Sequence, residues 1–223
     1  MPQQNEVAGP LTVDVAGQPF QLWPQRALYW PTQATLFIAD PHFGKAAAFR
    51  HLGVPVPAGS STADTGRLSW LLELTTAQRL VILGDFLHAR HGREEHTLAV
   101  LERWRQRHSQ LEIVLVRGNH DRGAGDPPAT LEIRCVDEPW AMGDFACAHD
   151  PEAADPDRYT FAGHVHPAIS LNMPAAPMRC RCYVLGRRVA VLPSFGSFTG
   201  SHPVHRRATD RIFALGPDAV VEV

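Results

Sequence analysis

One stretch of the sequence, Thr35-Leu-Phe-Ile-Ala-Asp-Pro-His42, joins an uninterrupted apolar run to a polar motif. The same arrangement recurs twice, where Asp85 follows Leu80-Val-Ile-Leu83 and Asn119 follows Ile113-Val-Leu-Val116. Short apolar runs rich in β-branched residues are typical of strands that are buried on both faces of a sheet. Because ligand sites in open α/β sheets lie at the carboxyl ends of the strands, we expect these polar residues to lie together at one edge.

Helical patterns separate these strands. A loop rich in Gly and Pro, residues 51–61, precedes a helical pattern from about Ala63 to Leu74, and a second such pattern runs from about Arg93 to His108. Upstream, residues 11–15 and 20–23 are typical of a hairpin, and residues 27–30 of a further strand. The alternation of strand and helix in this half predicts a parallel sheet with covering helices.

The second half of the chain contains mostly strand patterns joined by short loops. We expect strands at about residues 130–136, 145–148, 159–162, 179–185, 188–192 and 211–215. Two more polar motifs follow strands here, His149 after residues 144–148 and Gly163-His-Val-His166 after residues 159–162. A run of strands after an alternating half predicts a second sheet that packs on the first.

The polar motifs supply oxygen and imidazole ligands, which suit Mn²⁺, Fe or Zn²⁺. A shared aspartate can hold two such ions roughly 3.5–4 Å apart in a two-metal site. Any one of these residues alone is more often a capping aspartate or a core histidine, but their recurrence at successive strand ends favours metal ligands. The candidate ligands are Asp40, His42, Asp85, Asn119, His149, His164 and His166.

The ordered series D-x-H, G-D, G-N-H-D, H and G-H-x-H resembles the calcineurin-like metallophosphoesterase superfamily, from about Thr35 to Pro193. Three flanking stretches are similar to the bacterial ligase-associated DNA damage response endonuclease family: Ile38-Ala-Asp-Pro-His-Phe-Gly-Lys45, Leu83-Gly-Asp-Phe-Leu-His88-Ala-Arg90 and Leu192-Pro-Ser-Phe-Gly-Ser-Phe-Thr-Gly200. The resemblance implies an α/β fold in which two mixed β-sheets pack as a sandwich with helices on the outer faces. We expect a single domain over residues 1–223.

The resemblance also implies how the ligands divide between two divalent transition metals. One metal would be held by Asp40, His42 and His166, the other by Asn119, His149 and His164, and Asp85 would bridge them. Mn²⁺ is the expected metal, with Fe and Zn²⁺ as alternatives. A bridging carboxylate screens the repulsion between two dications, and neutral imidazoles complete each shell without excess charge.

Two residues next to a ligand are candidate catalytic groups. His120 follows Asn119, so its ring could reach the phosphate and act as a general acid or as a charge stabiliser. Asp121 would orient and charge that ring, and the alternative is an aspartate that forms the turn before Arg122. No covalent enzyme intermediate is needed when a metal-activated water attacks phosphorus.

Further residues beyond the motifs are candidate substrate contacts. Lys45, Arg90 and Arg122 could bind a non-scissile phosphate, with a solvated surface role as the alternative for each. His88 could contact substrate or pack in its loop. The segment Phe195-Gly-Ser-Phe-Thr-Gly200 combines small and aromatic residues, so it could let backbone approach a substrate or form a close-packed turn.

Composition sets limits on location and partners. The formal charge of −2 shows no global basic excess, although two dications would add local positive charge for a polyanion. The sequence has neither an apolar stretch of membrane-spanning length nor the start of a signal peptide, so we expect a cytoplasmic protein without membrane contact. The four cysteines lack zinc-ribbon spacing, and reduced, mostly buried thiols are expected.

The leading functional hypothesis is a Mn²⁺-dependent phosphodiesterase or nuclease that acts on DNA in repair, with DNA-repair proteins as partners by family resemblance. One alternative is hydrolysis of a small phosphodiester or phosphomonoester such as a nucleotide. Another is a non-catalytic scaffold that kept the fold. The complete ligand set argues against the scaffold, because an interaction surface has no physical need for paired-metal ligands.

Overall fold

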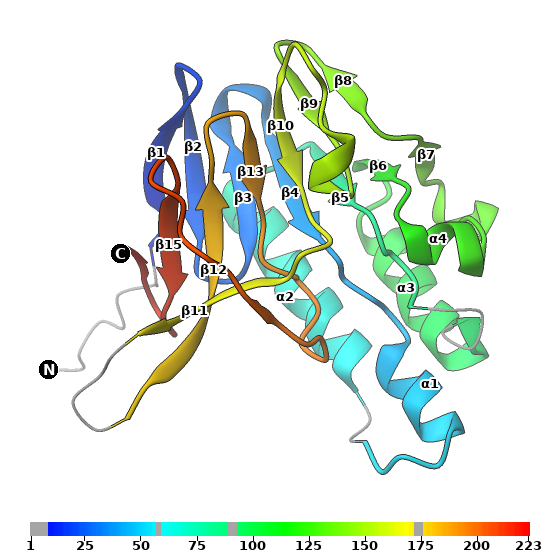
Figure 1. The fold of residues 1–223 in the computed structure, drawn as a ribbon. Coiled ribbons are helices and arrows are strands. Elements are labelled where there is room, and N and C mark those ends of the chain that lie inside the picture. The colour runs from blue at the N-terminus through cyan, green and yellow to red at the C-terminus, as the bar shows by residue number, and fades with distance from the viewer. Residues whose placement is uncertain (1–8, 57–58, 89–92, 172–175) are drawn as a thin grey trace, which may run out of the picture.

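The computed structural model describes residues 9–56, 59–88, 93–171 and 176–223, and it consists of two β-sheets packed face to face (Figure 1). The first sheet has seven strands in the order β1 to β7, and the second has nine. The expected α/β sandwich of two mixed sheets with flanking helices is confirmed. Among the described residues, no helix combines the length and apolar character needed to cross a membrane.

The first sheet is antiparallel over its first four strands and parallel from the fourth to the seventh. Its parallel half therefore brings the carboxyl ends of several strands to one edge, as the sequence predicted. The strands are β1 (Leu11–Val15), β2 (Gln18–Trp23), β3 (Ala27–Trp30), β4 (Thr35–Ala39), β5 (Arg79–Leu83), β6 (Glu112–Val116) and β7 (Arg134–Val136).

The second sheet is also mixed, because β10 runs parallel to both of its neighbours, β9 and β13, while β12 pairs antiparallel with β11, β13 and β15. Its strands are β8 (Trp140–Met142), β9 (Phe145–Cys147), β10 (Tyr159–Ala162), β11 (Pro167–Leu171), β12 (Met178–Leu185), β13 (Val189–Val191), β14 (His202–Pro203), β15 (Arg211–Leu215) and β16 (Val220–Glu222).

Strand β4 shows why its sequence is apolar at every position. Leu36 and Ile38 pack toward the helices, whereas Phe37 and Ala39 pack toward the second sheet, so both faces are buried. The core between the sheets combines aliphatic and aromatic side chains, and the ring of Phe161 lies 5.3 Å from that of Phe37. Each such side chain contributes roughly 1.5–3 kcal/mol by leaving water.

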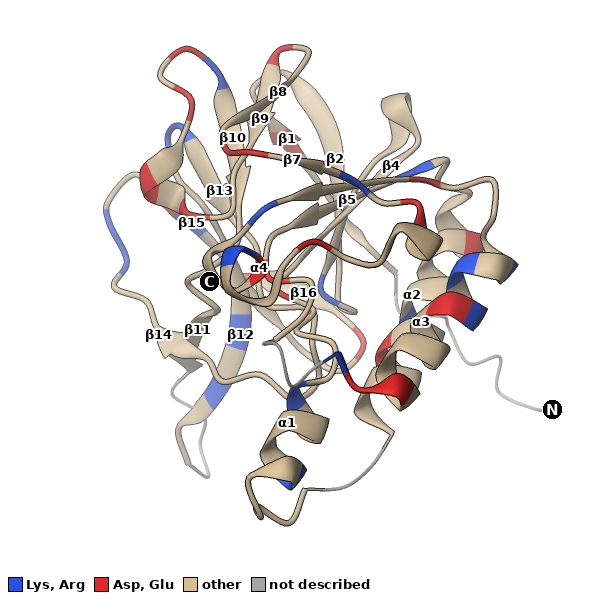
Figure 2. Cartoon of the chain, turned by 90° about the vertical axis from the view of Figure 1, so that its right-hand side faces the viewer, with Lys and Arg blue, Asp and Glu red and all other residues tan. Residues whose placement is uncertain are grey.

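Among the described residues, the first half of the chain has four α-helices: α1 (Lys45–His51), α2 (Ser60–Thr75), α3 (Glu95–Arg107) and α4 (Asn119–Ala124). Helices α2 and α3 cover the outer face of the first sheet with Leu68, Leu71, Leu101 and Trp104. The colours of Figure 2 mark both acidic and basic residues on α3, as expected of a helix with a solvent-exposed polar face.

The structure corrects two expectations about elements. The strand expected over residues 130–136 begins only at Arg134, because a 3-10 turn, Ala129–Leu131, buries Leu131 beside α3, and Glu132 then leaves the turn with a left-handed backbone. This strand, β7, pairs with β6 and so belongs to the first sheet rather than the second. Helix α1 was not expected; it contains three consecutive alanines, the residue with the best helix propensity.

Candidate metal centre

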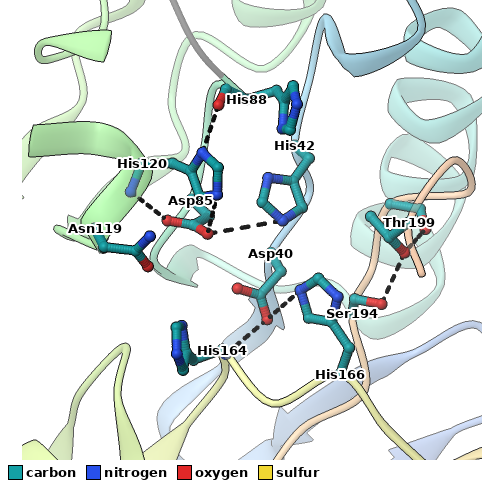
Figure 3. Close-up of polar contacts among 12 residues, drawn as sticks. Asp40, His42, Asp85, His88, Asn119, His120, His164, His166, Ser194 and Thr199 are labelled. Carbon is teal, nitrogen blue, oxygen red and sulfur yellow. Dashed lines mark hydrogen bonds and ion pairs between the residues drawn. The ribbon is translucent and has the colours of Figure 1, made fainter. Parts of the chain in front are cut away.

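All seven candidate ligands lie near the ends of strands. Figure 3 shows six of them together, Asp40, His42, Asp85, Asn119, His164 and His166. Asp40, Asp85 and Asn119 follow the neighbouring parallel strands β4, β5 and β6, and His42 also follows β4. The other three histidines follow strands of the second sheet, His149 after β9 and His164 and His166 after β10. Sheet packing brings the two sets together: the ring of His149 lies against the first sheet, with its Nδ1 3.1 Å from the carbonyl oxygen of Leu83.

One group consists of Asp40, His42 and His166, whose ligand atoms all lie within 4.8 Å of one another. His166 Nε2 is 3.6 Å from Asp40 Oδ2. His42 Nε2 faces a different carboxylate, with 3.7 Å to Asp85 Oδ2. These separations leave room for a cation between groups that do not otherwise bond to one another.

A second group centres on His149. Its Nε2 is 2.9 Å from Asn119 Oδ1 and 3.0 Å from His164 Nδ1. The same nitrogen is 3.6 Å from Asp85 Oδ1. Asp85 therefore presents one carboxylate oxygen to the first group and the other oxygen to the second, which is the position that a bridging ligand needs.

The electrostatics of the centre favour a bound cation. Asp40 is 0% exposed and Asp85 3%, and burial raises the pKa of Asp85. Burial alone would lower the pKa of His149, but the carboxylates of Asp40 and Asp85 outweigh it and raise that pKa. Burial, with Lys45 nearby, lowers the pKa of His42 to about 2, so this imidazole is neutral, as a ligand must be.

Unpartnered polar atoms give a direct test of fit. Within the described parts of the chain, Asp40 Oδ1 and His42 Nδ1 are buried and have no hydrogen-bond partner. Such atoms are costly unless something satisfies them. Carboxylate, amide and imidazole donors converging around buried negative charge are the set that divalent transition metals take, so the residues fit two such ions.

The backbone at the centre is strained. Asp40, His42, Asp85, His164 and His166 all have positive φ, between 46° and 66°. For residues other than glycine, this conformation costs on the order of 1–3 kcal/mol each, and it persists only where the surrounding structure imposes it. These tight loops direct their side chains into one small volume.

His120 lies beside both groups, with its Nε2 3.9 Å from Asp85 Oδ2 and its side chain 38% exposed. Its backbone N–H donates to Asp85 Oδ1 at 3.0 Å. The ring is held by His88, whose carbonyl oxygen lies 2.6 Å from His120 Nδ1 (Figure 3) and whose own ring stacks at 5.1 Å. Since a carbonyl only accepts, Nδ1 is the donor, and Nε2 is directed toward the centre.

The carboxylate of Asp121 binds backbone groups, so its expected role of orienting the His120 ring stays a prediction. Its buried carboxylate accepts the backbone N–H groups of Asp85 at 2.7 Å, Phe86 at 2.9 Å and Gly118 at 2.9 Å. Burial raises the pKa of Asp121 to about 6, and these donors oppose that rise because they favour the charged form. Asp121 thus fixes the loop that carries Asp85.

The crystal structure of Pseudomonas putida nuclease MPE is 41% identical to this chain, covers 96% of it and 100% of its own length, and superimposes with a TM-score of 0.84. The chain belongs to the metallophosphoesterase family. Two further solved structures are similar to this metallophosphoesterase. The Aquifex aeolicus protein AQ665, of unknown function, shares 19% identity over 63% of this chain and 81% of its own, with a TM-score of 0.39. The phosphoesterase Yfce from E. coli shares 18% identity over 85% of this chain and 97% of its own, with a TM-score of 0.41. No protein-family model and no curated protein matches the chain.

The candidate substrate residues of this metallophosphoesterase differ in how close they lie to the metal centre. Lys45 is half-buried at the start of α1 and is close enough to Asp85 and Asp40 for their charges to raise its pKa, although burial lowers that pKa on balance. Arg122 forms an ion pair with Glu138 at 3.1 Å. His88 lies beside His120, and Arg90 falls outside the described residues.

Sequence reasoning missed Glu138, which supports the second ligand group. One of its carboxylate oxygens accepts the backbone N–H of His149 at 2.8 Å and that of Asp150 at 2.9 Å, and the other pairs with Arg122. The partners are brought together by the second sheet and α4 rather than by a local motif. No sequence signal marks this role.

Proposed function

We propose that this metallophosphoesterase is a two-metal phosphodiesterase that hydrolyses DNA, and so a metal-dependent nuclease of DNA repair. The observation that carries the proposal is the division of ligands into two groups that share Asp85, with His120 beside them. The 41% identity to a nuclease over nearly the whole chain supports the substrate class.

One ion would be held by Asp40, His42 and His166, and the other by Asn119, His149 and His164. Asp85 would bind both ions. Bound dications, for which Mn²⁺ is our first choice, would supply Lewis-acid stabilisation of phosphate charge and acidify a water to a pKa of about 7. The buried carboxylates of Asp40 and Asp85 would balance part of that charge.

His120 is proposed as the general acid. The bond to the His88 carbonyl keeps a proton on Nδ1, so the acid is the imidazolium form of His120, which would give its Nε2 proton to the leaving oxygen and remain as the neutral ring. Asp85 and the stacked ring of His88 hold the imidazole in place, and its exposure lets a substrate reach it. A positioned acid of this kind contributes typically 10²–10⁴-fold to the rate.

Substrate charge is met locally rather than by the whole protein. Lys45 lies near the carboxylates of the centre and would face a phosphate beside the scissile one. Because the net charge is −2, binding of DNA should be weak and strongly salt-dependent. A cytoplasmic location, a single domain and repair-protein partners stay predictions.

The test uses the Mn²⁺-loaded protein on a bis-aryl phosphodiester, a mono-aryl phosphate and single-stranded DNA. We expect diester cleavage to exceed monoester cleavage, and DNA to compete with the aryl diester at low salt. His120→Ala should keep its metals and lose 10²–10⁴-fold activity, less with good leaving groups. His96→Ala, an exposed histidine on α3, is the matched control.

Two outcomes would move the assignment. Brisk turnover of a nucleotide monoester without any DNA effect at low salt would favour the small-molecule alternative. An equal loss in His120→Ala for poor and good leaving groups would assign His120 to charge stabilisation instead of proton transfer.

A further inference from the structure

Residues 194–200, here named the 194–200 loop, lie against the metal centre without contributing a candidate ligand. Phe195 N donates to the carbonyl oxygen of Ala39 at 2.7 Å, and Gly196 N to that of Asp40 at 3.3 Å. Figure 3 shows Ser194 and Thr199 of this loop beside His166. The approach is close: a Cβ on Gly196 would lie 2.4 Å from the carbonyl oxygen of Pro41.

The buried Asp64 and three half-buried arginines fix the conformation of this loop. Arg26 donates to the carbonyl oxygens of Phe195 and Gly196, both at 3.1 Å, and Arg67 also donates to Phe195. Asp64 pairs with Arg67 at 2.9 Å and accepts the backbone N–H of Ser197. Arg181 donates to the Thr199 hydroxyl at 2.9 Å and its carbonyl oxygen at 2.7 Å, and also to Ser194.

Such a cluster is a costly way to stabilise a fold. Burial raises the pKa of Asp64 and lowers the pKa values of Arg67 and Arg181 to about 10 each. Buried ion pairs are often no more stabilising than apolar residues of similar volume, because desolvation offsets their attraction. The cluster holds a surface loop next to the metal centre in one conformation.

The loop presents one aromatic side chain, the half-buried Phe198. Its ring meets that of Phe49, on α1, edge to face at 5.5 Å. Phe49 lies 6.2 Å from His88, which stacks on His120 at 5.1 Å. Ring contacts therefore continue from the proposed general acid to the tip of the loop, two elements that are far apart in sequence.

We propose that Phe198 and Phe49 form a platform for the nucleobase of the nucleotide next to the scissile phosphate. This inference rests on the proposed function and adds to it the residues that recognise the base. A base can pack on aromatic rings whatever its identity, because every base has a π-face. The buried cluster keeps Phe198 in position before substrate arrives, which lowers the ordering cost of binding.

The experiment compares two chromogenic diesters with the same leaving group, thymidine 5′-(4-nitrophenyl phosphate) and its abasic deoxyribose analogue. In the Mn²⁺-loaded wild-type protein we expect kcat/KM to be roughly 5–150-fold higher with the base, the range that corresponds to ~1–3 kcal/mol of base–aromatic stacking. Phe198→Ala and Phe49→Ala should each reduce this preference through KM, with a larger loss on the thymidine diester than on the abasic one.

Further variants separate a platform from a structural role. Phe198→Trp should retain the preference, and Phe198→Leu, which keeps apolar volume but no flat ring, should lose it. Trp70→Ala removes an exposed aromatic ring from α2, and it should leave kcat/KM unchanged for both diesters.

Each failure has a distinct meaning. Equal wild-type rates on both diesters, or equal losses on both in Phe198→Ala and Phe198→Leu, would overturn the platform while leaving phosphodiester hydrolysis intact. If the wild-type protein hydrolyses neither diester, the proposed function itself fails.

Discussion

Gly84→Ala tests how the loop before Asp85 builds the centre. Gly84 has φ +76°, and a Cβ placed on it would lie 2.1 Å from His149 Nδ1 and 2.4 Å from Cγ of the same ring. Real contacts are never so short, so the substitution must displace the His149 ring, which is buried. We expect the second ligand group to be lost with it.

The magnitude follows from two terms. An alanine in the left-handed region costs roughly 1–2 kcal/mol, and an overpacked methyl group costs typically 1–3 kcal/mol more. Gly17, in the turn between β1 and β2, has φ +81° but nothing within 4 Å of its Cβ position, so Gly17→Ala incurs the first term alone. At roughly 2–4 °C per kcal/mol for a chain of this length, the melting temperature should fall by about 4–20 °C in Gly84→Ala and about 2–8 °C in Gly17→Ala.

Scanning calorimetry and metal analysis on the same Mn²⁺-reconstituted samples measure both effects. We expect Gly17→Ala to keep the wild-type metal content and Gly84→Ala to lose one equivalent or more. Equal melting of the two variants with unchanged metal content in Gly84→Ala would refute the placement of His149 against Gly84.

Three other predictions concern stability and thiol chemistry. Asp121→Ala leaves three buried N–H groups without an acceptor, so urea denaturation should show a loss of ~3 kcal/mol or more in the free energy of unfolding. Unchanged stability, together with a changed dependence of the rate on the leaving group, would instead indicate that Asp121 acts on the His120 ring. Chelation should lower the melting temperature by roughly 8–16 °C for each of the two ions, about 16–32 °C in all, relative to protein in Mn²⁺ at a thousandfold excess over the Kd of each site; an unchanged melting curve would argue against metal binding. Burial raises the pKa of the Cys135 thiol to about 11 and that of Cys182 to about 12. An aromatic disulfide reagent should therefore label these thiols slowly in the native protein, and the rate should rise about tenfold for each unit of increasing pH below those values. Fast labelling at neutral pH would contradict this prediction.

The sequence predicted the parts of the fold that depend on short-range pattern. β4, β5 and β6 are buried on both faces, so their sequences are continuous apolar runs that end in polar motifs. The division of the candidate ligands into two groups came from family resemblance. Their convergence from two sheets depends on packing between segments that are far apart in the chain.

What the sequence did not predict depends on long-range or weak signals. The carboxylate of Asp121 was assigned to the neighbouring His120, but its partners include Asp85 and Phe86, thirty-five or more residues away. The support of the 194–200 loop by Arg67 and Asp64 also joins distant segments. Short elements such as β14, with two residues, carry too little pattern to be distinguished from a loop.

Metal stoichiometry in Asp85→Asn tests the central claim, that two ions share one carboxylate. Wild-type protein reconstituted with Mn²⁺ should hold two ions per chain, and Asp85→Asn should lose most of the second ion together with hydrolysis of the bis-aryl diester. Asp144→Asn, which makes the same charge change at an exposed position, should match the wild type. Two ions per chain in Asp85→Asn would contradict the bridging assignment.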